Sequence, residues 1–383
     1  MFTIIILFLV ILSVLVFVHE LGHFVAARRA GMRVDEFGFG FPPRALGVTK
    51  DPKTGTWRFV GAKTNRRPRT IYSINWIPLG GFVRIKGEDG AGRTAEDSFA
   101  NKSGLARIVV LSAGVIMNFL LAWVIFAVVF MIGAPQAVDS DEQVSGDTFV
   151  QIGRIVPDSP AEEMGIRIGD TILGLHVEDN KWLRTRSISD VQEYIGERQG
   201  EEAKLLIQRG DEQLPLVGTP RSEYPEDEGA LGVELVRTSV TSYPWYEAIW
   251  RGLMTVFMLI GAILAAFGNL IKMLFTTGSA PADIAGPVGI AFYTKQVADL
   301  GFTYVLQFAA ILSVNLGIIN ILPIPALDGG RVVFVLIEMI KGSPVSQRFE
   351  QATHSIGFVL LLLLMAVITF YDFIRFDILG RFL

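Results

Sequence analysis

Residues 19–23 read His-Glu-Leu-Gly-His, so two imidazoles flank a carboxylate within one short segment. On a helix, positions i and i+4 share one face about one turn apart, so His19 and His23 can bind the same metal ion. Neutral imidazole suits Zn²⁺, and a catalytic zinc takes three protein ligands and keeps a fourth position for water, whose pKa falls to about 7. Glu20 would accept the proton of that water as it attacks a carbonyl, and would deliver a proton to the leaving amine. The pattern predicts zinc-dependent hydrolysis.

The alternative is that this short pattern arose by accident and merely ends a helix. The chain holds only 4 histidines, and two of them lie in this segment. Glu20 also closes an apolar run, where an unpaired carboxylate would be costly. Both observations favour a metal site. Since the chain has no cysteine, the other ligands must be histidines or carboxylates.

The third ligand must come from another part of the chain, and Asp328 is the leading candidate. It lies in residues 320–330, which read Asn-Ile-Leu-Pro-Ile-Pro-Ala-Leu-Asp-Gly-Gly. The two prolines open the helical backbone and the two glycines permit close approach. The alternative is that Asp328 only caps a helix beginning near Arg331. His354, at a helix entrance, and His176, in a segment expected to form a soluble domain, are weaker ligand candidates.

The composition is that of a membrane protein. Of the 383 residues, 51% are hydrophobic and 19% are charged, and the mean hydropathy is +0.44, which is too apolar for an ordinary soluble protein. A spanning helix needs roughly 20 apolar residues. Candidate runs lie at residues 2–18, 108–132, 253–267, 302–322 and 356–371. We therefore expect a polytopic α-helical protein in a lipid bilayer, with no nucleic-acid partner.

Charge is distributed unevenly along the chain, and this predicts an orientation. Residues 24–108 hold 16 Lys and Arg against 7 Asp and Glu, whereas residues 134–243 hold 10 against 22. Basic loops stay on the cytoplasmic side of a membrane. We therefore expect the first loop inside, and the acidic segment and the N-terminus outside. The segment 19–23 would then lie toward the cytoplasmic side.

Two stretches between the apolar runs carry the pattern of β-structure. Residues 33–87 alternate apolar and polar positions around Gly and Pro, which predicts short membrane-associated β-hairpins. Residues 149–220 predict one small α/β domain, with strands at 149–156, 171–177 and 203–208 and a helix at 188–198. Within it, residues 159–172 resemble the signature of bacterial PDZ domains, which bind a peptide as an extra strand in a groove. The alternative is a spacer domain whose groove stays empty.

The segment 19–23, the Asn-x-x-Pro-x-Pro-x-Leu-Asp-Gly-Gly motif at 320–330 and the PDZ-like domain between them together resemble the site-2 protease family, over nearly the whole chain. The resemblance implies an intramembrane zinc metalloprotease of the bacterial inner (cytoplasmic) membrane. It would hydrolyse peptide bonds within transmembrane segments of single-pass membrane proteins, such as anti-sigma factors or signal-peptide remnants.

The resemblance also assigns residues. It implies that His19, His23 and Asp328 bind Zn²⁺, that Glu20 is catalytic and that Asn320 contacts the substrate backbone. A helical substrate hides its scissile amide, so a β-hairpin edge would hold the unwound segment as an added strand. The further substrate-binding residues implied are Gly38, Gly40, Gly80 and Gly81, which flank this hairpin, and Pro323 and Pro325.

The sequence departs from the family's pattern in two places. Residues 113–118 resemble its second-helix motif, but Val115 stands where the motif has proline, so no role is predicted for Asn118. Better-known bacterial relatives carry two PDZ domains in tandem, whereas residues 134–243 accommodate one. A peptide ligand of that domain is possible on this pattern, but its identity is not predicted.

These expectations divide the chain into four regions. Residues 1–133 form an N-terminal membrane core, 134–243 an extracytoplasmic region with the PDZ domain at about 149–220, 244–301 an interfacial or re-entrant segment, and 302–383 a C-terminal membrane core. The fold class is thus a polytopic α-helical membrane protein with four spanning helices, a membrane-associated β-hairpin region and one extracytoplasmic α/β PDZ domain.

Residues 248–275 look like a fifth spanning helix, but the metal site argues against a crossing. Asp328 can meet the histidines only if 302–322 descends from outside to inside. A crossing at 248–275 would reverse that direction and leave Asp328 about 30 Å away. We therefore expect 248–275 to lie in the outer interface or to turn back near Gly268 and Asn269.

Two other functions are weighed against intramembrane proteolysis. One is a PDZ-bearing membrane scaffold or chaperone with structural zinc, which the intact Glu20 disfavours. The other is a membrane-tethered protease of soluble substrates, which the position of 19–23 at the end of an apolar helix disfavours.

Overall fold

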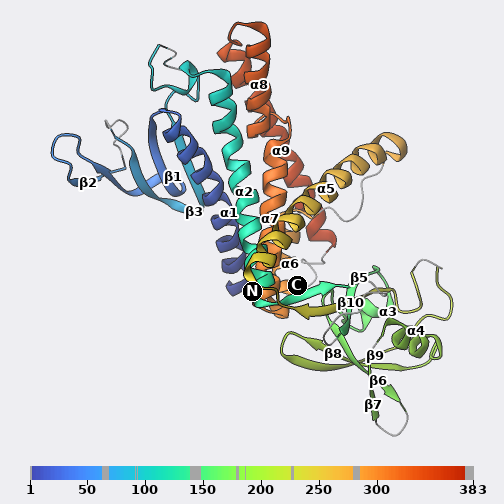
Figure 1. The fold of residues 1–383 in the computed structure, drawn as a ribbon. Coiled ribbons are helices and arrows are strands. Elements are labelled where there is room, and N and C mark those ends of the chain that lie inside the picture. Colours follow the sequence, from blue (N-terminus) through green and yellow to red (C-terminus); the bar gives the residue numbers. More distant parts are fainter. Residues whose placement is uncertain are drawn as a thin grey trace. The chain divides into compact units, whose positions relative to one another are not determined.

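The computed structural model describes residues 2–62, 69–90, 92, 94–138, 148–177, 181–185, 187–225, 228–278 and 285–375. The chain forms two compact units, each built from separate stretches of sequence (Figure 1). The first comprises residues 1–125, 252–291 and 309–383, and the second comprises 126–251 and 292–308.

Five helices are long and apolar enough to cross a membrane. Runs of Leu, Ile, Val and Phe without interior proline allow each to continue for 20 to 33 residues. They are α1 (Phe2–Arg29), α2 (Gly104–Ile132), α5 (Trp245–Thr277), α7 (Phe302–Ile321) and α9 (Gln347–Arg375). Shorter helices are η1 (Phe99–Asn101), α6 (Pro287–Leu300) and α8 (Asp328–Lys341). The chain is thus a membrane protein in architecture.

The β-structure of the first unit is a curled antiparallel sheet in the order β2-β1-β3. Its strands are β1 (Val34–Lys50), β2 (Trp57–Val60) and β3 (Ile71–Ile85). The sheet curls because β1 pairs with both ends of β3, so that Phe37 opposes Tyr72 as well as Val83. Large apolar side chains are left exposed on it, Phe59 by 84% and Trp76 by 71%. Such a surface suits contact with lipid.

The sheet packs on α1 through two glycines. A Cβ atom at Gly80 would lie 2.5 Å from a methyl carbon of Val16, and one at Gly81 would lie 3.1 Å from the Cα atom of Phe17. Gly80 also has a φ of +68°, which an L residue rarely adopts. These positions bring the end of β3 beside the helix that carries His19 and His23.

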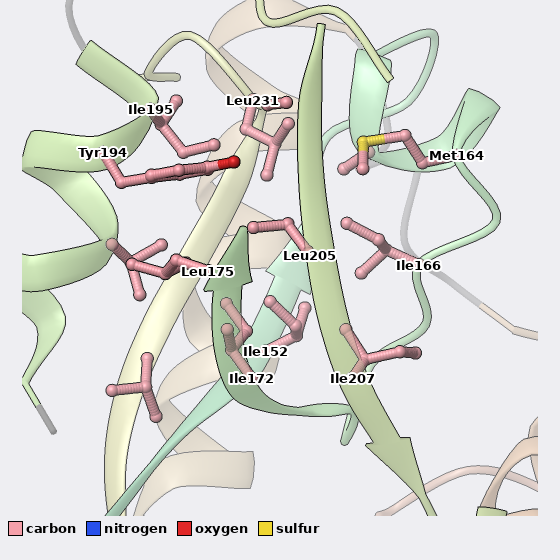
Figure 2. Close-up of a cluster of buried hydrophobic side chains, with 14 of the residues drawn as sticks. Ile152, Met164, Ile166, Ile172, Leu175, Tyr194, Ile195, Leu205, Ile207 and Leu231 are labelled. Atoms are coloured by element: carbon pink, nitrogen blue, oxygen red, sulfur yellow. The ribbon is translucent and has the colours of Figure 1, made fainter. Parts of the chain in front are cut away.

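The second unit contains a seven-stranded sheet in the order β4-β10-β5-β6-β8-β9, with β7 paired to β6. Its strands are β4 (Ala134–Ala137), β5 (Thr148–Ile155), β6 (Thr171–Val177), β7 (Lys181–Arg184), β8 (Ala203–Arg209), β9 (Glu212–Gly218) and β10 (Val233–Thr241). Its own helices are α3 (Pro160–Glu163) and α4 (Ile188–Gly196), the latter held by a capping box between Ser187 and Asp190. Side chains of β5, β6, β8 and α4 form the apolar core (Figure 2).

The elements expected between 149 and 208 are formed, because alternating apolar residues such as Ile172 and Leu205 bury one face of each strand. The sheet continues beyond residue 220, since β10 pairs with β5 and Leu231 joins the same core. This final strand had no counterpart among the expected pieces.

Two local expectations are wrong. No turn occurs near Gly268 and Asn269, because α5 runs without a break from Trp245 to Thr277. One glycine among strong helix formers costs only about 1 kcal/mol, which is too little to end a helix. The helix expected near Arg331 begins instead at Asp328, with Leu327 in the capping position. Asp328 therefore does not cap that helix.

Candidate metal centre and active site

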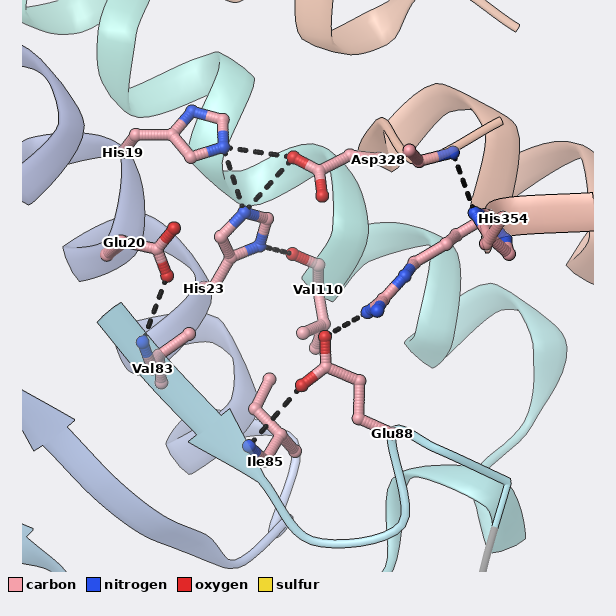
Figure 3. A network of polar contacts seen from close by, with 11 residues as sticks. His19, Glu20, His23, Val83, Ile85, Glu88, Val110, Asp328 and His354 are labelled. Carbon is pink, nitrogen blue, oxygen red and sulfur yellow. Dashed lines mark hydrogen bonds and ion pairs between the residues drawn. The ribbon is translucent and has the colours of Figure 1, made fainter. Parts of the chain in front are cut away.

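Helix α1 carries the two imidazoles of the first motif toward the interior of the first unit. His19 and His23 are 5% and 6% exposed, and their ring centroids are 4.8 Å apart. One turn of helix separates them, which makes both Nε2 atoms point into the same space (Figure 3). Two potential metal ligands are therefore supplied by a single rigid element.

Asp328 completes a group of three possible ligands, although it lies 309 residues from His19. Its Oδ2 atom is 2.9 Å from His19 Nε2 and 3.2 Å from His23 Nε2, and the two Nε2 atoms are 3.1 Å apart (Figure 3). Two ligands of a tetrahedral zinc lie about 3.3 Å apart, because each zinc–ligand bond is about 2.0 Å. The three atoms are thus spaced like three corners of a zinc tetrahedron. The residues present fit the metal that their chemistry implies.

The loop between α7 and α8 brings Asp328 to the histidines. Ala326 adopts a φ of +77°, and its N–H donates a 2.8 Å hydrogen bond to His354 Nδ1 of α9. A Cβ atom at Gly329 would lie 2.2 Å from the carbonyl oxygen of Ile321, so only glycine lets α8 start against the end of α7. The loop is therefore held on both sides.

Glu20 lies beside this group and is oriented by the sheet. Its Oε2 atom accepts a 3.1 Å hydrogen bond from the backbone N–H of Val83 in β3. Glu20 lines a cavity of about 290 Å³ together with His19, Asp328 and Asn320. The full lining is Val16, His19, Glu20, Leu316, Asn320, Ala326, Leu327 and Asp328. A base and a possible metal site thus share one cavity.

The other residues expected to bind substrate are distributed differently. Asn320 lines the cavity, and its side chain makes no hydrogen bond to any other residue that the structure describes. Pro323 is exposed, and Pro325 packs against Gly357 of α9, so neither lines the cavity.

The four glycines of the sheet serve close packing in the structure. Gly80 and Gly81 lie against α1, as described above. A Cβ atom at Gly38 would lie 2.3 Å from Ser73 Oγ, and one at Gly40 would lie 2.5 Å from the carbonyl oxygen of Ile77. None of the four lines the cavity that holds Glu20.

The weaker ligand candidates stay outside the ligand group. His176 lies in β6 of the second unit, where its ring contacts Trp182 at 5.3 Å between centroids. His354 accepts the hydrogen bond from Ala326, and its ring contacts Phe334. Among the described residues, the group of His19, His23 and Asp328 is the one that has metal-ligand spacing.

The sequence did not predict the contribution of α2. The carbonyl oxygen of Val110 lies 2.8 Å from His23 Nδ1, and the Asn118 amide lies 3.2 Å from His19 Nδ1. Between them, Gly114 leaves room for both rings. Val110, Gly114 and Asn118 lie four residues apart, and Asn118 is a polar residue within an apolar helix. Both features mark this face of α2 in the sequence. The approach of α2 to α1, however, depends on the tertiary fold.

Comparisons with known proteins agree with this geometry. The profile of Peptidase family M50 matches residues 7–364. The zinc metalloprotease RasP of Geobacillus kaustophilus is 30% identical, over 97% of this chain and 98% of its own length. The regulator of sigma-W protease RasP of Bacillus subtilis is also 30% identical, with the same coverage of 97% and 98%.

A family match over nearly the whole chain and full-length similarity to zinc metalloproteases identify both the activity and its metal. The chain therefore belongs to peptidase family M50, the site-2 proteases, and is a zinc-dependent intramembrane protease.

Proposed function

We propose that His19, His23 and Asp328 hold the zinc ion and that Glu20 is the general base. The observation that carries the proposal is the convergence of the three ligand atoms, within 4.8 Å of one another, beside a cavity that Glu20 lines together with His19 and Asp328. When bound, zinc polarises the scissile carbonyl and acidifies the attacking water. Glu20 takes the proton of that water and passes a proton to the leaving amine.

Asn320 and the edge of β3 would hold the substrate. Asn320 lines the cavity, and its amide can pair with a peptide group of an extended chain. The outer edge of β3 is partly taken, because the N–H of Val83 bonds Glu20 and that of Ile85 bonds Glu88. Before Val83, Ser13 Oγ of α1 accepts from the N–H of Gly80 and donates to the Pro78 carbonyl, so an added strand would replace these side-chain bonds with main-chain bonds. Pro323 and Pro325 do not line the cavity and would act indirectly, by opening the backbone of the loop that carries Asp328.

The substrates proposed are transmembrane segments of single-pass membrane proteins. The name of the Bacillus subtilis relative links that protein to sigma-W regulation. By analogy, an anti-sigma factor or a signal-peptide remnant is a suitable substrate class for this chain. Glu20 in the same cavity as the ligand group disfavours a scaffold or chaperone with structural zinc, because a structural site has no use for a base.

The orientation proposed has four spanning helices in a bacterial inner membrane, with the N-terminus outside and the zinc site toward the cytoplasm. Contacts within the second unit support this. Arg167 lies in the seven-stranded sheet domain of the second unit and forms a 2.9 Å ion pair with Asp299 at the end of α6. The start of α7 therefore lies on the same side of the membrane as that domain. If α5 crossed, α6 would have to return, but its 14 residues span only about 21 Å against a hydrocarbon core of about 30 Å.

The domain of the second unit is proposed to be an extracytoplasmic PDZ domain. A cavity of about 670 Å³ lies between α4 and the start of β10. Its apolar lining includes Val191 and Ile195 on the helix and Val233 and Leu235 on the strand. β4 covers the far end of β10, from Thr238 to Thr241, and leaves the start beside α4 available for an added peptide strand.

The proposed activity is tested with purified full-length protein and a panel of single-pass membrane peptides. Mass spectrometry should find products cut within the transmembrane segment, and a zinc chelator should abolish them. Soluble versions of the same cut sequences serve as the control. Cleavage confined to the soluble versions would refute intramembrane substrates, and products that persist in chelator would refute the zinc mechanism.

A further inference from the structure

Helix α2 presents three successive turns of one face to the two histidines. Val110, Gly114 and Asn118 are spaced four residues apart, so they lie along one stripe of the helix. Each of them meets an imidazole, as the distances above show. A metal-binding histidine normally bonds a protein group through its second nitrogen, which fixes its tautomer and orientation. This stripe of α2 is placed to bond the second nitrogen of both rings.

The contact to His23 defines its tautomer. A backbone carbonyl can only accept, so the 2.8 Å contact with Val110 requires a hydrogen on His23 Nδ1. A neutral His23 then carries its lone pair on Nε2, which faces Asp328 Oδ2 at 3.2 Å. This is the form in which the ring can bind a metal through Nε2.

Gly114 lets α2 come this close. A Cβ atom there would lie 2.5 Å from His23 Nε2 and 2.7 Å from His19 Nε2. Real side chains do not approach so closely, so the rings would have to move. The absence of a side chain at this turn lets the backbone of α2 lie directly beside both Nε2 atoms.

Asn118 faces His19 in the same way, and the oxygen and nitrogen of its amide can exchange places. The amide nitrogen is 3.2 Å from His19 Nδ1, while Oδ1 is buried without a hydrogen-bond partner among the described residues. Oxygen and nitrogen of an amide are interchangeable by a 180° rotation about χ2. With zinc on His19 Nε2, a neutral imidazole must carry its hydrogen on Nδ1. Only the amide oxygen can then face it as an acceptor.

The backbone at Asn118 is fixed by α7. The hydroxyl of Ser313 donates a 2.8 Å hydrogen bond to the Asn118 carbonyl oxygen, and both residues are fully buried. Gly317, one turn further along α7, lies against Phe119. The helix that leads to the Asp328 loop therefore also sets the position of Asn118.

We propose that Asn118 is a positioning residue, whose amide oxygen accepts a hydrogen bond from His19 Nδ1–H and thereby orients Nε2 toward the zinc. The proposal rests on the ligand role proposed for His19. It gives Asn118 a function that Val110 performs for His23 through its backbone. Because the residue acts through His19, its removal should weaken metal binding and not only catalysis.

The test measures the zinc affinity of purified full-length variants by competition with a chromogenic chelator. Asn118→Leu keeps the volume but removes the acceptor, and should weaken zinc binding by about 10- to 100-fold. Asn118→Asp keeps an acceptor and removes the donor, so it should bind zinc at least as tightly as the native protein. Asn315→Leu, a matched change on α7 outside the ligand group, should leave the affinity unchanged.

The outcomes separate this inference from the proposed function. Native affinity in Asn118→Leu, or weakened affinity in Asn118→Asp, would overturn the acceptor role. If Asn118→Leu fails to fold, Asn118→Asp alone decides, because a donor role predicts that it loses zinc. Retained zinc in His19→Ala would instead refute the ligand assignment itself. The melting temperature of chelator-treated protein shows whether Asn118→Leu also destabilises the fold.

Discussion

At the scale of residues, the site depends on a few atoms that meet from distant parts of the chain. The sequence predicts that His19, Glu20 and His23 share a site, because their spacing on a helix is a local property. It also indicates Asp328 through its Pro and Gly surroundings, and the structure brings all four together. Asn118 could not be assigned, because its contact with His19 requires a particular approach of α2 to α1.

The glycines illustrate the same limit. Gly38, Gly40, Gly80 and Gly81 are recognisable from the sequence as positions that need a small residue. Whether the space is reserved for a substrate or for a neighbouring strand or helix depends on the tertiary structure. In this protein it is filled by Ser73, Ile77, Val16 and Phe17 respectively.

Asp328→Ala should reduce the zinc content of purified protein from about one equivalent to near zero, because an open zinc site needs three protein ligands. His19→Ala and His23→Ala should do the same. Metal analysis after dialysis provides the measurement, and Asp89→Ala, an exposed change in the same unit, provides the control. If Asp328→Ala binds zinc like the native protein, the third ligand lies elsewhere.

Gly114→Ala should abolish zinc binding and cleavage together, because its methyl group would occupy the space 2.5 Å from His23 Nε2. Gly261→Ala is the matched control, since a Cβ atom at Gly261 in α5 meets no atom within 4 Å. Zinc affinity and peptide cleavage are measured for both variants. Normal zinc binding by Gly114→Ala would show that α2 does not lie against the Nε2 ends of the two rings.

At the scale of elements, local propensity predicts what forms but not always where it ends. The strands at 149–156 and 171–177 follow from alternation, and the long helices follow from apolar runs. The continuity of α5 was missed, because Gly268 and Asn269 resemble a turn locally while the surrounding helix formers outweigh them. The strand β10 was missed because its partner β5 lies far away in sequence.

The proposal that α5 lies in the outer interface is tested by labelling. Only 6% of its most apolar window is buried in the protein, and Trp245, Tyr246 and Trp250 are exposed near its start, as at a membrane surface. Single cysteines at Ser242, Thr277 and Lys295 should all react with a membrane-impermeant maleimide in intact cells. Protection of Thr277 and Lys295 alone would mean that α5 crosses, and would contradict the four-helix topology.

At the scale of the whole molecule, the chain combines a catalytic unit with a separate sheet domain. The sequence indicates such a domain through its acidic charge and its turn residues, but the sheet also recruits β4 and β10 from outside 149–220. Long-range pairing of this kind is set by burial of the common core, which no short window of sequence displays.

The groove of the sheet domain should select among full-length substrates without affecting the chemistry. Gln192→Trp places a large ring in the groove beside α4, whereas Glu193→Trp puts the same ring on the exposed side of that helix. We expect Gln192→Trp to change the order of preference among full-length substrates and to leave cleavage of a short transmembrane peptide unchanged. Identical substrate profiles for both variants and the native protein would support a spacer role.

The central claim is that Glu20 is the base of a zinc site formed by His19, His23 and Asp328, and Glu20→Gln tests it most directly. The amide preserves the volume of the side chain but accepts no proton, so cleavage of a transmembrane peptide should fall by at least about 10²-fold. The same preparation should retain about one equivalent of zinc, because the three ligands are unchanged. Cleavage at the native rate by Glu20→Gln with zinc bound would contradict the account.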